Sequence, residues 1–478
     1  MDRRTFAAEH LRLLQVERQA EIAEAERLLL QRSDAELQAR GTALLRLEVA
    51  DLEPGFGGRL HAVLRPSRGE LPAHRFGPGD VVAVREHKDQ RPLCTGVFVR
   101  GRSDTVTVAL DDDEVELPGL VRLDQMVTDV TFRRLDSALR ELQREQKGEP
   151  ARFLDVLFGE RDPEFAPKPA TDAIRWFDEA LDPSQREAVA HALRAEHVAL
   201  IHGPPGTGKT TAVVELIRQC VGRGERVLAC APSNVAVDNL AERLLRAGLR
   251  VVRLGHPARV HAAVRDVSLA SLVADAPEQK LLRDVKREVE QGLRKVHRAK
   301  TRQDRFAARN EVRALRAELR HLEAAITKGL VDGAEVVLAT TTGAADERLF
   351  ERSFDRVVVD EAAQALEAAC WIPLQRGRRL VLAGDHKQLP PTIQSAEAAA
   401  GGLARTMFER LNARYARVWH GAFDHVVQPP GRIASRFRVE NTLHDGSLRV
   451  KHNCNFFSVR GERFDAVVVY MSGDNSLA

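Results

Sequence analysis

The segment GPPGTGKT, residues 203–210, constrains the fold more than any other part of the sequence. It follows the apolar run HVALI and opens a segment with a helical pattern, TAVVELIRQC. A glycine-rich loop that ends in Gly-Lys-Ser/Thr between a strand and a helix is the phosphate-binding loop, in which backbone N–H groups and the helix N-terminus face the phosphates. The alternative is a fortuitous glycine-rich turn, which the flanking strand and helix disfavour. The segment therefore predicts a nucleotide site on an α/β sheet.

Each part of this loop has a predicted role. Lys209 is expected to reach the β- and γ-phosphates, and the Thr210 hydroxyl to ligate Mg²⁺. The predicted ATP-binding set is Gln185, Gly203, Pro204, Pro205, Gly206, Thr207, Gly208, Lys209, Thr210 and Thr211.

Continuous apolar runs alternate with helical segments over residues 181–395. The runs are HVALIHG, RVLACAP, RVVRLG, EVVLAT, RVVVDE and RRLVLAGD. Strands of this kind separated by helices indicate a parallel sheet that is covered on both faces. We therefore predict an α/β P-loop domain of the RecA-like kind over residues 175–400.

Two of these runs end in polar side chains that complete a hydrolytic site. In FDRVVVDEAAQ, Asp360 is expected to hold Mg²⁺ and Glu361 to deprotonate the attacking water, although two strand-end carboxylates could also be a structural cap. In RRLVLAGDHKQLPPT, Gln388 is expected to bond to the γ-phosphate or the attacking water, although alone this segment is only a Gly-Asp turn. The predicted catalytic set is Lys209, Asp360, Glu361 and Gln388, with Thr210 and Asp360 as metal ligands.

Three further segments place polar groups beside this site, each with a structural alternative. In LDPSQREAV, Gln185 could pair with the adenine edge, although the residues alone favour a helix cap by Asp182 or Ser184. In APSNVAVDNL, Ser233 and Asn234 lie at a strand-to-helix junction and could contact phosphodiesters. The threonines of ATTTGA, 340–342, lie at a similar junction, and either segment could be a plain turn.

The residues before the P-loop domain divide into three parts. Residues 1–42 have helical spacing, and Gly41 is a plausible stop. Short alternating runs punctuated by Gly, Pro and Asp over 43–127 indicate a small β-barrel or sandwich. Residues 128–174 return to helical spacing and then become rich in proline, as in a linker. A barrel inserted between two helices that pair as a stalk is the predicted arrangement.

A helical insertion is predicted inside the P-loop domain, at about 275–328. Two stretches of three/four spacing flank AKTRQDRF, which could hold the bend of an antiparallel hairpin. Lys and Arg outnumber Asp and Glu by seven over 278–328, whereas the whole chain has a net charge of +3. This excess is explained by either a solvated hairpin face or a nucleic-acid surface.

Composition excludes several classes of protein. Apolar residues make up 44% and charged residues 29% of the chain, which is ordinary globular usage and argues against wholesale disorder. The five cysteines form no CxxC pair, so a disulfide scaffold and a Cys-rich zinc site are disfavoured and a reducing, cytoplasmic location is expected. The sequence shows no secretory signal and no run long enough for a membrane span.

Taken together, the motifs resemble those of the superfamily-1B helicases, in the Upf-like group and of the immunoglobulin-mu-binding-protein-2 type. The resemblance covers about residues 5–418. It is carried by LDPSQREAV, IHGPPGTGKTTAVVE, CAPSNVAVDNL, RLGHPAR, VVLATTTGA, VVVDEAAQALEA, LAGDHKQLPPT, and GDVV with DVTFRRLDSAL.

The resemblance implies two RecA-like domains, a β-barrel on a helical stalk and a helical insertion in the first domain. It implies ATP-driven 5′-to-3′ translocation on single-stranded DNA or RNA with unwinding, and it carries over the roles given above for the nucleotide-site residues. Strand contacts are implied at Pro232, Ser233, Asn234, Val235, Asp238, Asn239, Thr340, Thr341 and Thr342. These would mostly be made to the nucleic-acid backbone.

The sequence departs from the family pattern after FERLNARYARV, 408–418. The family's later motifs, which belong to the second RecA-like domain, do not follow, and 401–478 is expected to be an incomplete or aberrant remnant of that domain. A truncated helicase that binds ATP, hydrolyses it slowly and does not unwind alone is therefore predicted. The alternatives are an ATP-binding, nucleic-acid-binding module without turnover and a P-loop ATPase that remodels proteins.

Overall fold

The computed structural model describes residues 2–471 with internal gaps. The gaps are 31–32, 56–58, 87–90, 113–114, 127–128, 168–173, 205, 415–425, 429–431, 443–447 and 461–462. From Arg414 onward, the description covers the backbone alone.

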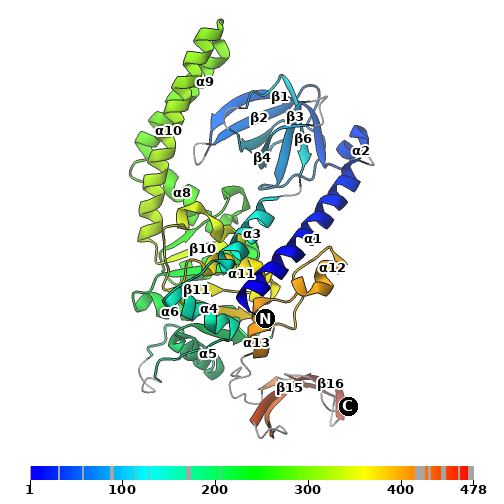
Figure 1. Cartoon of the computed structure of the whole chain (residues 1–478), viewed down its shortest axis with the longest axis vertical. Coiled ribbons are helices and arrows are strands. Elements are labelled where there is room, and N and C mark those ends of the chain that lie inside the picture. Colours follow the sequence, from blue (N-terminus) through cyan, green and yellow to red (C-terminus); the bar gives the residue numbers. More distant parts are fainter. Residues whose placement is uncertain are drawn as a thin grey trace.

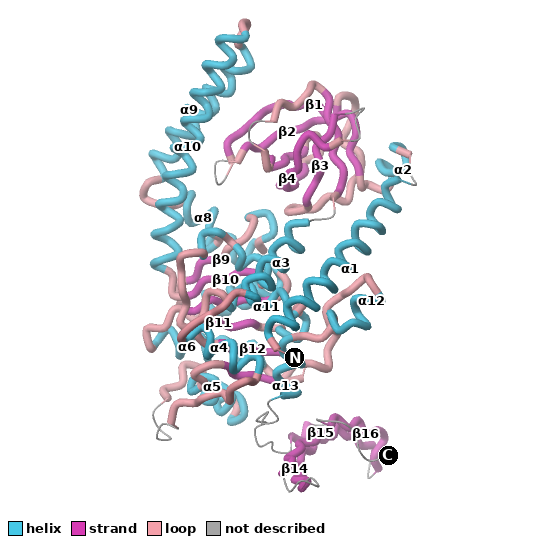
Figure 2. Tube along the Cα trace, in the orientation of Figure 1, coloured by secondary structure: helices cyan, strands magenta, loops and turns pink. Residues whose placement is uncertain are grey.

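A six-stranded parallel sheet forms the centre of the molecule (Figures 1 and 2). Its order is β7-β12-β11-β8-β10-β9, and the six predicted runs supply its six strands. The strands are β7 (Val198–His202), β8 (Val227–Ala231), β9 (Val251–Arg253), β10 (Val336–Thr340), β11 (Arg356–Val359) and β12 (Leu380–Gly384). The predicted α/β class is confirmed.

Alternate side chains of these strands enter two different cores, one on each face of the sheet. On one face, Ala229, Leu338 and Val358 pack with α5 (Pro183–Arg194), α6 (Lys209–Gly222) and α7 (Asn234–Arg246). On the other, Leu228, Val337 and Val359 pack with α3 (Asp129–Gln143), α4 (Glu149–Phe158) and α11 (Glu367–Leu374). Burial on both faces explains why the runs lack a polar alternation.

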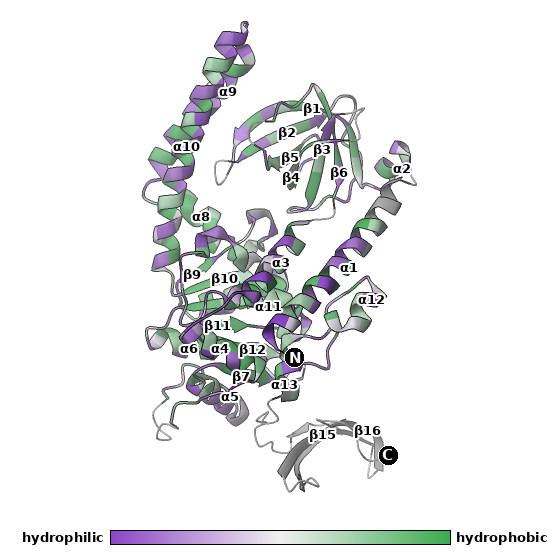
Figure 3. Ribbon diagram, in the orientation of Figure 1, coloured by the Kyte–Doolittle hydropathy of each residue, from purple (hydrophilic) through white to green (hydrophobic). Residues whose placement is uncertain are grey.

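The predicted barrel is closed, with the strand order β1-β2-β5-β4-β3-β6 and antiparallel neighbours. Its strands are β1 (Ala43–Pro54), β2 (Leu60–Pro66), β3 (Val81–Glu86), β4 (Pro92–Gly101), β5 (Val106–Leu110) and β6 (Leu120–Gln125). Its core is apolar and is formed by leucine, valine, alanine, phenylalanine and Cys94 side chains, and green, hydrophobic residues are common along its strands in Figure 3. Closure removes the exposed strand edges that a small sandwich would leave.

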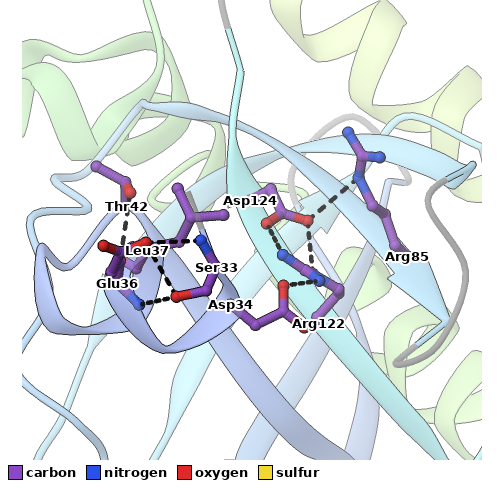
Figure 4. A network of polar contacts seen from close by, with 8 residues as sticks. All are labelled: Ser33, Asp34, Glu36, Leu37, Thr42, Arg85, Arg122 and Asp124. Carbon is purple, nitrogen blue, oxygen red and sulfur yellow. Dashed lines mark hydrogen bonds and ion pairs between the residues drawn. The ribbon is translucent and has the colours of Figure 1, made fainter. Parts of the chain in front are cut away.

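The helix expected before the barrel is divided into α1 (Arg3–Leu30) and α2 (Asp34–Ala39). Ser33 caps α2 in a reciprocal capping box with Glu36. Beside this cap, Asp124 of β6 is buried and pairs with Arg85 at 3.1 Å and Arg122 at 2.6 Å, and Arg122 also reaches Asp34 at 2.8 Å (Figure 4). Of these pairs, only Arg122–Asp34 joins the barrel to α2, whereas the pairs of Asp124 lie within the barrel.

The returning half of the stalk is α3, which packs along α1 through Phe132, Leu135 and Leu139. The helical pattern then breaks at Gly148, whose φ of 71° favours glycine, and α4 begins. The predicted pairing of two stalk helices, α1 and α3, is therefore confirmed.

The insertion consists of α8 (Leu269–Ala274), α9 (Gln279–Arg298) and α10 (Arg302–Gly333), and α9 and α10 form the hairpin that rises beside the barrel in Figure 1. Its bend lies at 299–301, within the predicted AKTRQDRF segment, and Thr301 caps α10. Leu293 of α9 packs against the barrel core, so the hairpin and the barrel touch.

The chain leaves the sheet through α12 (Ala396–Ala398), a π-helical turn (Ala399–Leu403) and α13 (Met407–Arg414). An antiparallel sheet follows, with the strands β13 (Val426–Gln428), β14 (Arg432–Thr442), β15 (Leu448–Arg460) and β16 (Arg463–Met471). The sequence indicated one strand in this segment, RFDAVVVYM, which corresponds to β16. Across the described residues, no helix is long and apolar enough to cross a bilayer.

Candidate functional site

The predicted nucleotide-site residues gather at one edge of the parallel sheet, where β7, β11 and β12 end. The P-loop follows β7, Asp360 follows β11, and the loop with Gln388 follows β12. Because the carboxyl ends of parallel strands meet at one edge, loops that are far apart in the sequence are brought together there.

The phosphate-binding loop is folded around the Pro204 carbonyl. The Thr207 hydroxyl donates to this oxygen at 2.8 Å, and the Lys209 ammonium donates to it at 3.3 Å. Lys209 is only 9% exposed, so its charge is held inside the loop. A bound phosphate would offer these donors a stronger, charged acceptor than a carbonyl.

Glycine is required in the loop at Gly208, the residue before α6. Its φ is 77°, and a Cβ there would lie 2.3 Å from the Gln185 amide nitrogen. Gly203 and Gly206 also lie in the loop between β7 and α6, whereas Pro205 lies outside the described residues. The Thr211 hydroxyl accepts a bond from Arg243 at 3.4 Å.

Thr210 and Asp360 meet across the site, with 3.2 Å between the Thr210 hydroxyl and a carboxylate oxygen of Asp360. Asp360 is 3% exposed, and its pKa is raised, first by burial and then by the neighbouring Glu361 charge. A buried carboxylate in this condition is stabilised by a bound cation. The hydroxyl and carboxylate oxygens are also the ligands that Mg²⁺ prefers, so the donor set fits this ion.

Glu361 and Gln388 are connected by a residue to which the sequence assigned no role. The Gln364 amide nitrogen donates to the Glu361 carboxylate at 3.2 Å and to the Gln388 side-chain oxygen at 3.3 Å. Glu361 has a left-handed backbone, with φ 52° and ψ 36°. Gln364 lies three residues after Glu361 on a 3-10 turn, Ala362–Gln364. Its spacing within DEAAQ was the signal that could have identified it.

Gln185 takes part in the helix cap that the sequence offered as the alternative, and it also contacts the phosphate-binding loop; its pairing with the adenine edge stays a prediction. Its oxygen accepts from the Asp182 backbone N–H at 3.0 Å, which completes a capping box at the start of α5. Its amide nitrogen donates to the Thr207 carbonyl at 3.0 Å. The cap therefore fixes the side chain against the phosphate-binding loop.

Two histidines lie beneath this loop, and neither was singled out from the sequence. His202 ends β7 and its Nε2 lies 3.3 Å from an Asp385 carboxylate oxygen. The ring of His386 is 4.8 Å from that of His202, centroid to centroid. Burial is the main cause that lowers the pKa of both histidines.

The predicted nucleic-acid segment 232–239 has both exposed and buried members. Ser233 caps α7, and it is exposed together with Val235 and Asn239, while Pro232 is half-buried. Asp238 is 5% exposed and its carboxylate accepts from Arg253 at 2.8 Å and from the His261 N–H at 2.8 Å. Arg253 also donates to the Asn234 side chain at 2.8 Å. For Asn234 and Asp238 the structure thus favours a positioning role.

The three threonines after β10 form a tight turn. The Thr340 hydroxyl accepts the Gly343 N–H at 2.9 Å, and Thr341 is 2% exposed. The Thr342 carbonyl accepts from Arg134 of the stalk helix α3 at 3.1 Å. This turn therefore joins the end of the sheet to the stalk that holds the barrel.

Two family models match the chain. Residues 180–396 match an AAA domain, and residues 7–129 match the 1B domain of the helicase SMUBP-2/HCS1 family. The first range contains the sheet and the nucleotide site, and the second contains α1 and the barrel.

Curated relatives match over most of the chain. The rat DNA-binding protein SMUBP-2 is 41% identical over 426 residues, which is 86% of this chain and 43% of the relative. The fission-yeast DNA polymerase alpha-associated DNA helicase A is 34% identical over 423 residues, 85% of this chain and 63% of the relative. A fruit-fly regulator of nonsense transcripts 1 homolog is 35% identical over 269 residues, 56% of this chain and 22% of the relative. The chain thus spans less than two thirds of the length of each.

Proposed function

We propose, from the kinship of this chain with the superfamily-1B helicases of the SMUBP-2 and Upf-like group, that it is an ATP-hydrolysing helicase component that acts on single-stranded DNA or RNA. The observation that carries the proposal is the meeting of Thr210 and Asp360 at 3.2 Å beside the buried ammonium of Lys209. The ammonium that would bind phosphate and the two oxygen ligands that would bind the cation therefore lie together.

The chain's own residues divide the work of hydrolysis. Lys209 and the loop N–H groups bind the β- and γ-phosphates, and Thr210 and Asp360 hold Mg²⁺. When bound, Mg²⁺ neutralises charge that develops on the phosphoryl oxygens. Glu361 takes the proton of the attacking water, and Gln388 orients that water or the γ-phosphate.

We propose that single-stranded nucleic acid binds across the ends of the neighbouring β-strands. Exposed Ser233, which caps α7, and exposed Val235 and Asn239 on α7 lie with the 340–342 turn after β10 on the sheet edge that carries the P-loop. Contacts of this kind are made to the phosphate backbone, so affinity should fall as salt rises. Movement along the strand in the 5′-to-3′ direction is part of the proposal and rests on the family kinship.

Slow turnover is proposed for the 478-residue chain by itself. P-loop enzymes gain about 10³–10⁵ in kcat from an arginine that reaches the γ-phosphate from a second lobe or partner. In the described part of residues 2–413, one RecA-like sheet is present. This favours, as the second candidate, a module that binds ATP and nucleic acid without turnover. A cytoplasmic location is also proposed, since the described cysteines are buried free thiols.

The test is ATP hydrolysis by the purified chain, with and without single-stranded DNA and RNA, at low and high salt. Turnover that either nucleic acid stimulates supports the helicase reading, and the stimulation should weaken at high salt. ATP binding with no turnover supports the second candidate. Turnover that is indifferent to both nucleic acids would contradict the proposal and favour a remodelling ATPase.

Two variants test the site itself. Lys209→Ala should lose nucleotide affinity together with turnover, because the buried ammonium is the phosphate ligand. Glu361→Gln should keep ATP binding and lose about 10²–10⁴ in kcat, because a general base is removed. Hydrolysis retained at the wild-type rate in either variant would overturn the assignment.

A further inference from the structure

A triad of metal-ligating side chains lies beneath the phosphate-binding loop and has no role in the proposed hydrolysis. It consists of His202, Asp385 and His386, whose ligand atoms all lie within 4.8 Å of one another. We propose that this triad is a site for a first-row transition-metal ion such as Zn²⁺ or Co²⁺, separate from the Mg²⁺ that accompanies ATP.

The backbone brings the three residues together without help from a metal. His202 and Gly384 are register partners on the adjacent parallel strands β7 and β12, and Asp385 and His386 follow Gly384 directly. The Gly203 N–H also donates to the Gly384 carbonyl at 3.3 Å, so the two strand ends stay paired up to the triad. Strand pairing thus brings His202 and Asp385 together before any ion binds.

The distance between the first two donors fits shared coordination. His202 Nε2 and Asp385 Oδ1 are 3.3 Å apart, which is long for an N–H···O hydrogen bond. Two ligands that each lie about 2.0–2.1 Å from one tetrahedral ion are about 3.3–3.4 Å apart. The pair therefore has the spacing of two corners of a zinc tetrahedron.

His386 supplies the third donor, and a second observation points to a missing partner. Its Nδ1 is buried and has no hydrogen-bond partner among the residues that the structure describes. A buried polar atom without a partner costs free energy, which a coordinated ion or an ordered water would recover. His386 is half-buried and lies in the loop after β12, so a change of side-chain rotamer can bring its ring toward the other two donors.

The chemistry of the donors selects the class of metal. Two imidazoles and one carboxylate suit Zn²⁺, Co²⁺ and similar ions, whereas Mg²⁺ prefers an all-oxygen site such as that of Thr210 and Asp360. Three protein ligands leave a fourth position for water. The surrounding charges are mixed, with Lys209 and Lys387 opposing a cation and Glu409 favouring it. The ion should therefore bind reversibly rather than as an irremovable structural zinc.

The experiment is a Co²⁺ titration of the full chain without nucleotide, followed by visible absorption. The proposal expects one saturable ion per chain, with the weak bands of tetrahedral nitrogen and oxygen coordination, and displacement by Zn²⁺. It also expects none of the intense charge-transfer absorption that cysteine ligation gives, because the described cysteines are buried. No saturable binding, or a thiolate spectrum, would overturn the proposal.

The variants locate the ion. His386→Ala should weaken Co²⁺ binding by at least about tenfold, and His202→Gln, a second variant, should do the same. The matched control is His321→Ala, which removes an exposed histidine of α10 and should bind as the wild type does. Equal binding by His386→Ala and His321→Ala would mean that surface histidines hold the ion, and the triad would be rejected. Because no nucleotide is present, failure here leaves the proposed hydrolysis untouched.

Discussion

Asp360 illustrates how a side chain suited to a reaction can oppose the stability of the fold. Its pKa is raised by burial and by the Glu361 charge, so the ionised form is disfavoured in the nucleotide-free protein. Asp360→Asn removes this charge and can keep partners for the Thr210 hydroxyl and the Glu361 N–H. We expect it to raise stability by about 0.5–2 kcal/mol, which corresponds to a few degrees in Tm, and to abolish Mg²⁺-dependent turnover.

Thermal unfolding without nucleotide measures the first effect and a steady-state ATPase assay the second. Asp355→Asn is a matched control, since its carboxylate already accepts the Arg226 N–H at 2.9 Å and it lies at the opposite edge of the sheet. A Tm of Asp360→Asn at or below the wild-type value would show that the Asp360 charge is already compensated.

Gln364 donates a hydrogen bond to each of Glu361 and Gln388, and we expect it to act by positioning them. Gln364→Ala frees both side chains, and a hydrogen bond to a charged group is worth about 1.5–3 kcal/mol. We expect roughly a tenfold loss in kcat, with little change in the KM for ATP, because phosphate binding is left intact. Steady-state kinetics separates the two constants.

The control for Gln364 is Gln375→Ala, an exposed glutamine after α11 at the far edge of the sheet. It should leave both constants unchanged. An increase in KM with kcat preserved in Gln364→Ala would place Gln364 in nucleotide binding instead of in positioning the base.

At the scale of elements, α1 is tied to the segment that follows the Gln388 loop. Glu17 is 4% exposed, and its carboxylate accepts the Gln394 N–H at 2.7 Å and the Ser395 N–H at 2.8 Å. Glu17→Ala leaves two backbone donors without this partner. We expect a loss of about 1.5–3 kcal/mol in the free energy of unfolding, the worth of a hydrogen bond to a charged group, because Gln394 is exposed and Ser395 is half-buried and water can replace part of the lost contact.

Urea denaturation measures the loss, and Glu9→Ala is the control on the same helix. Glu9 is partly exposed and forms an i,i+3 pair with Arg12, so its removal should change stability by less than about 0.5 kcal/mol. Equal effects of the two variants would show that the contact of α1 with 394–395 contributes nothing to stability.

The elements differ in how far the sequence could predict them. Strand runs, the barrel, the stalk and the hairpin were predictable, because burial on one or two faces imposes a period on the sequence. The break of the first stalk helix into α1 and α2 and the strands β13–β15 were not, since neither alters that period in a recognisable way. At the site, motif spacing predicts roles for the residues, but the His202–Asp385 contact depends on β7 lying beside β12, a matter of strand order that the motifs do not give.

At the scale of the whole molecule, the barrel contacts the segment after β9 and both helices of the hairpin, α9 and α10, and we call this contact the barrel seat. Arg259 donates to the Gly79 carbonyl, Arg309 pairs with Glu116, and Leu293 packs on the barrel core. Two histidines lie at this seat, His61 on β2 and His256 after β9. Burial, with nearby cations, lowers the pKa of each to about 4.

The groups around His61 and His256 determine how stability changes with pH. The groups that act on His61 are Arg100, Lys286 and Arg59, and those that act on His256 are His61, Arg259 and Arg59. All of them disfavour a proton on the ring. The unfolded chain, with an ordinary histidine pKa near 6.5, therefore binds more protons between pH 6.5 and about 4, so stability falls as pH falls through this range.

We therefore expect acidification to loosen the barrel seat first, and a double variant, His61→Gln with His256→Gln, to resist it. Urea denaturation at neutral pH and at about pH 5 should show a smaller loss of stability in the double variant, by up to about 1.4 kcal/mol per pH unit for each histidine. Hydrogen exchange should locate the wild-type loss in β1, β2 and residues 253–259. His321→Gln, on the exposed face of α10, is the control and should keep the wild-type slope. If the double variant also keeps that slope, the seat is stable to acid and other buried histidines cause the loss.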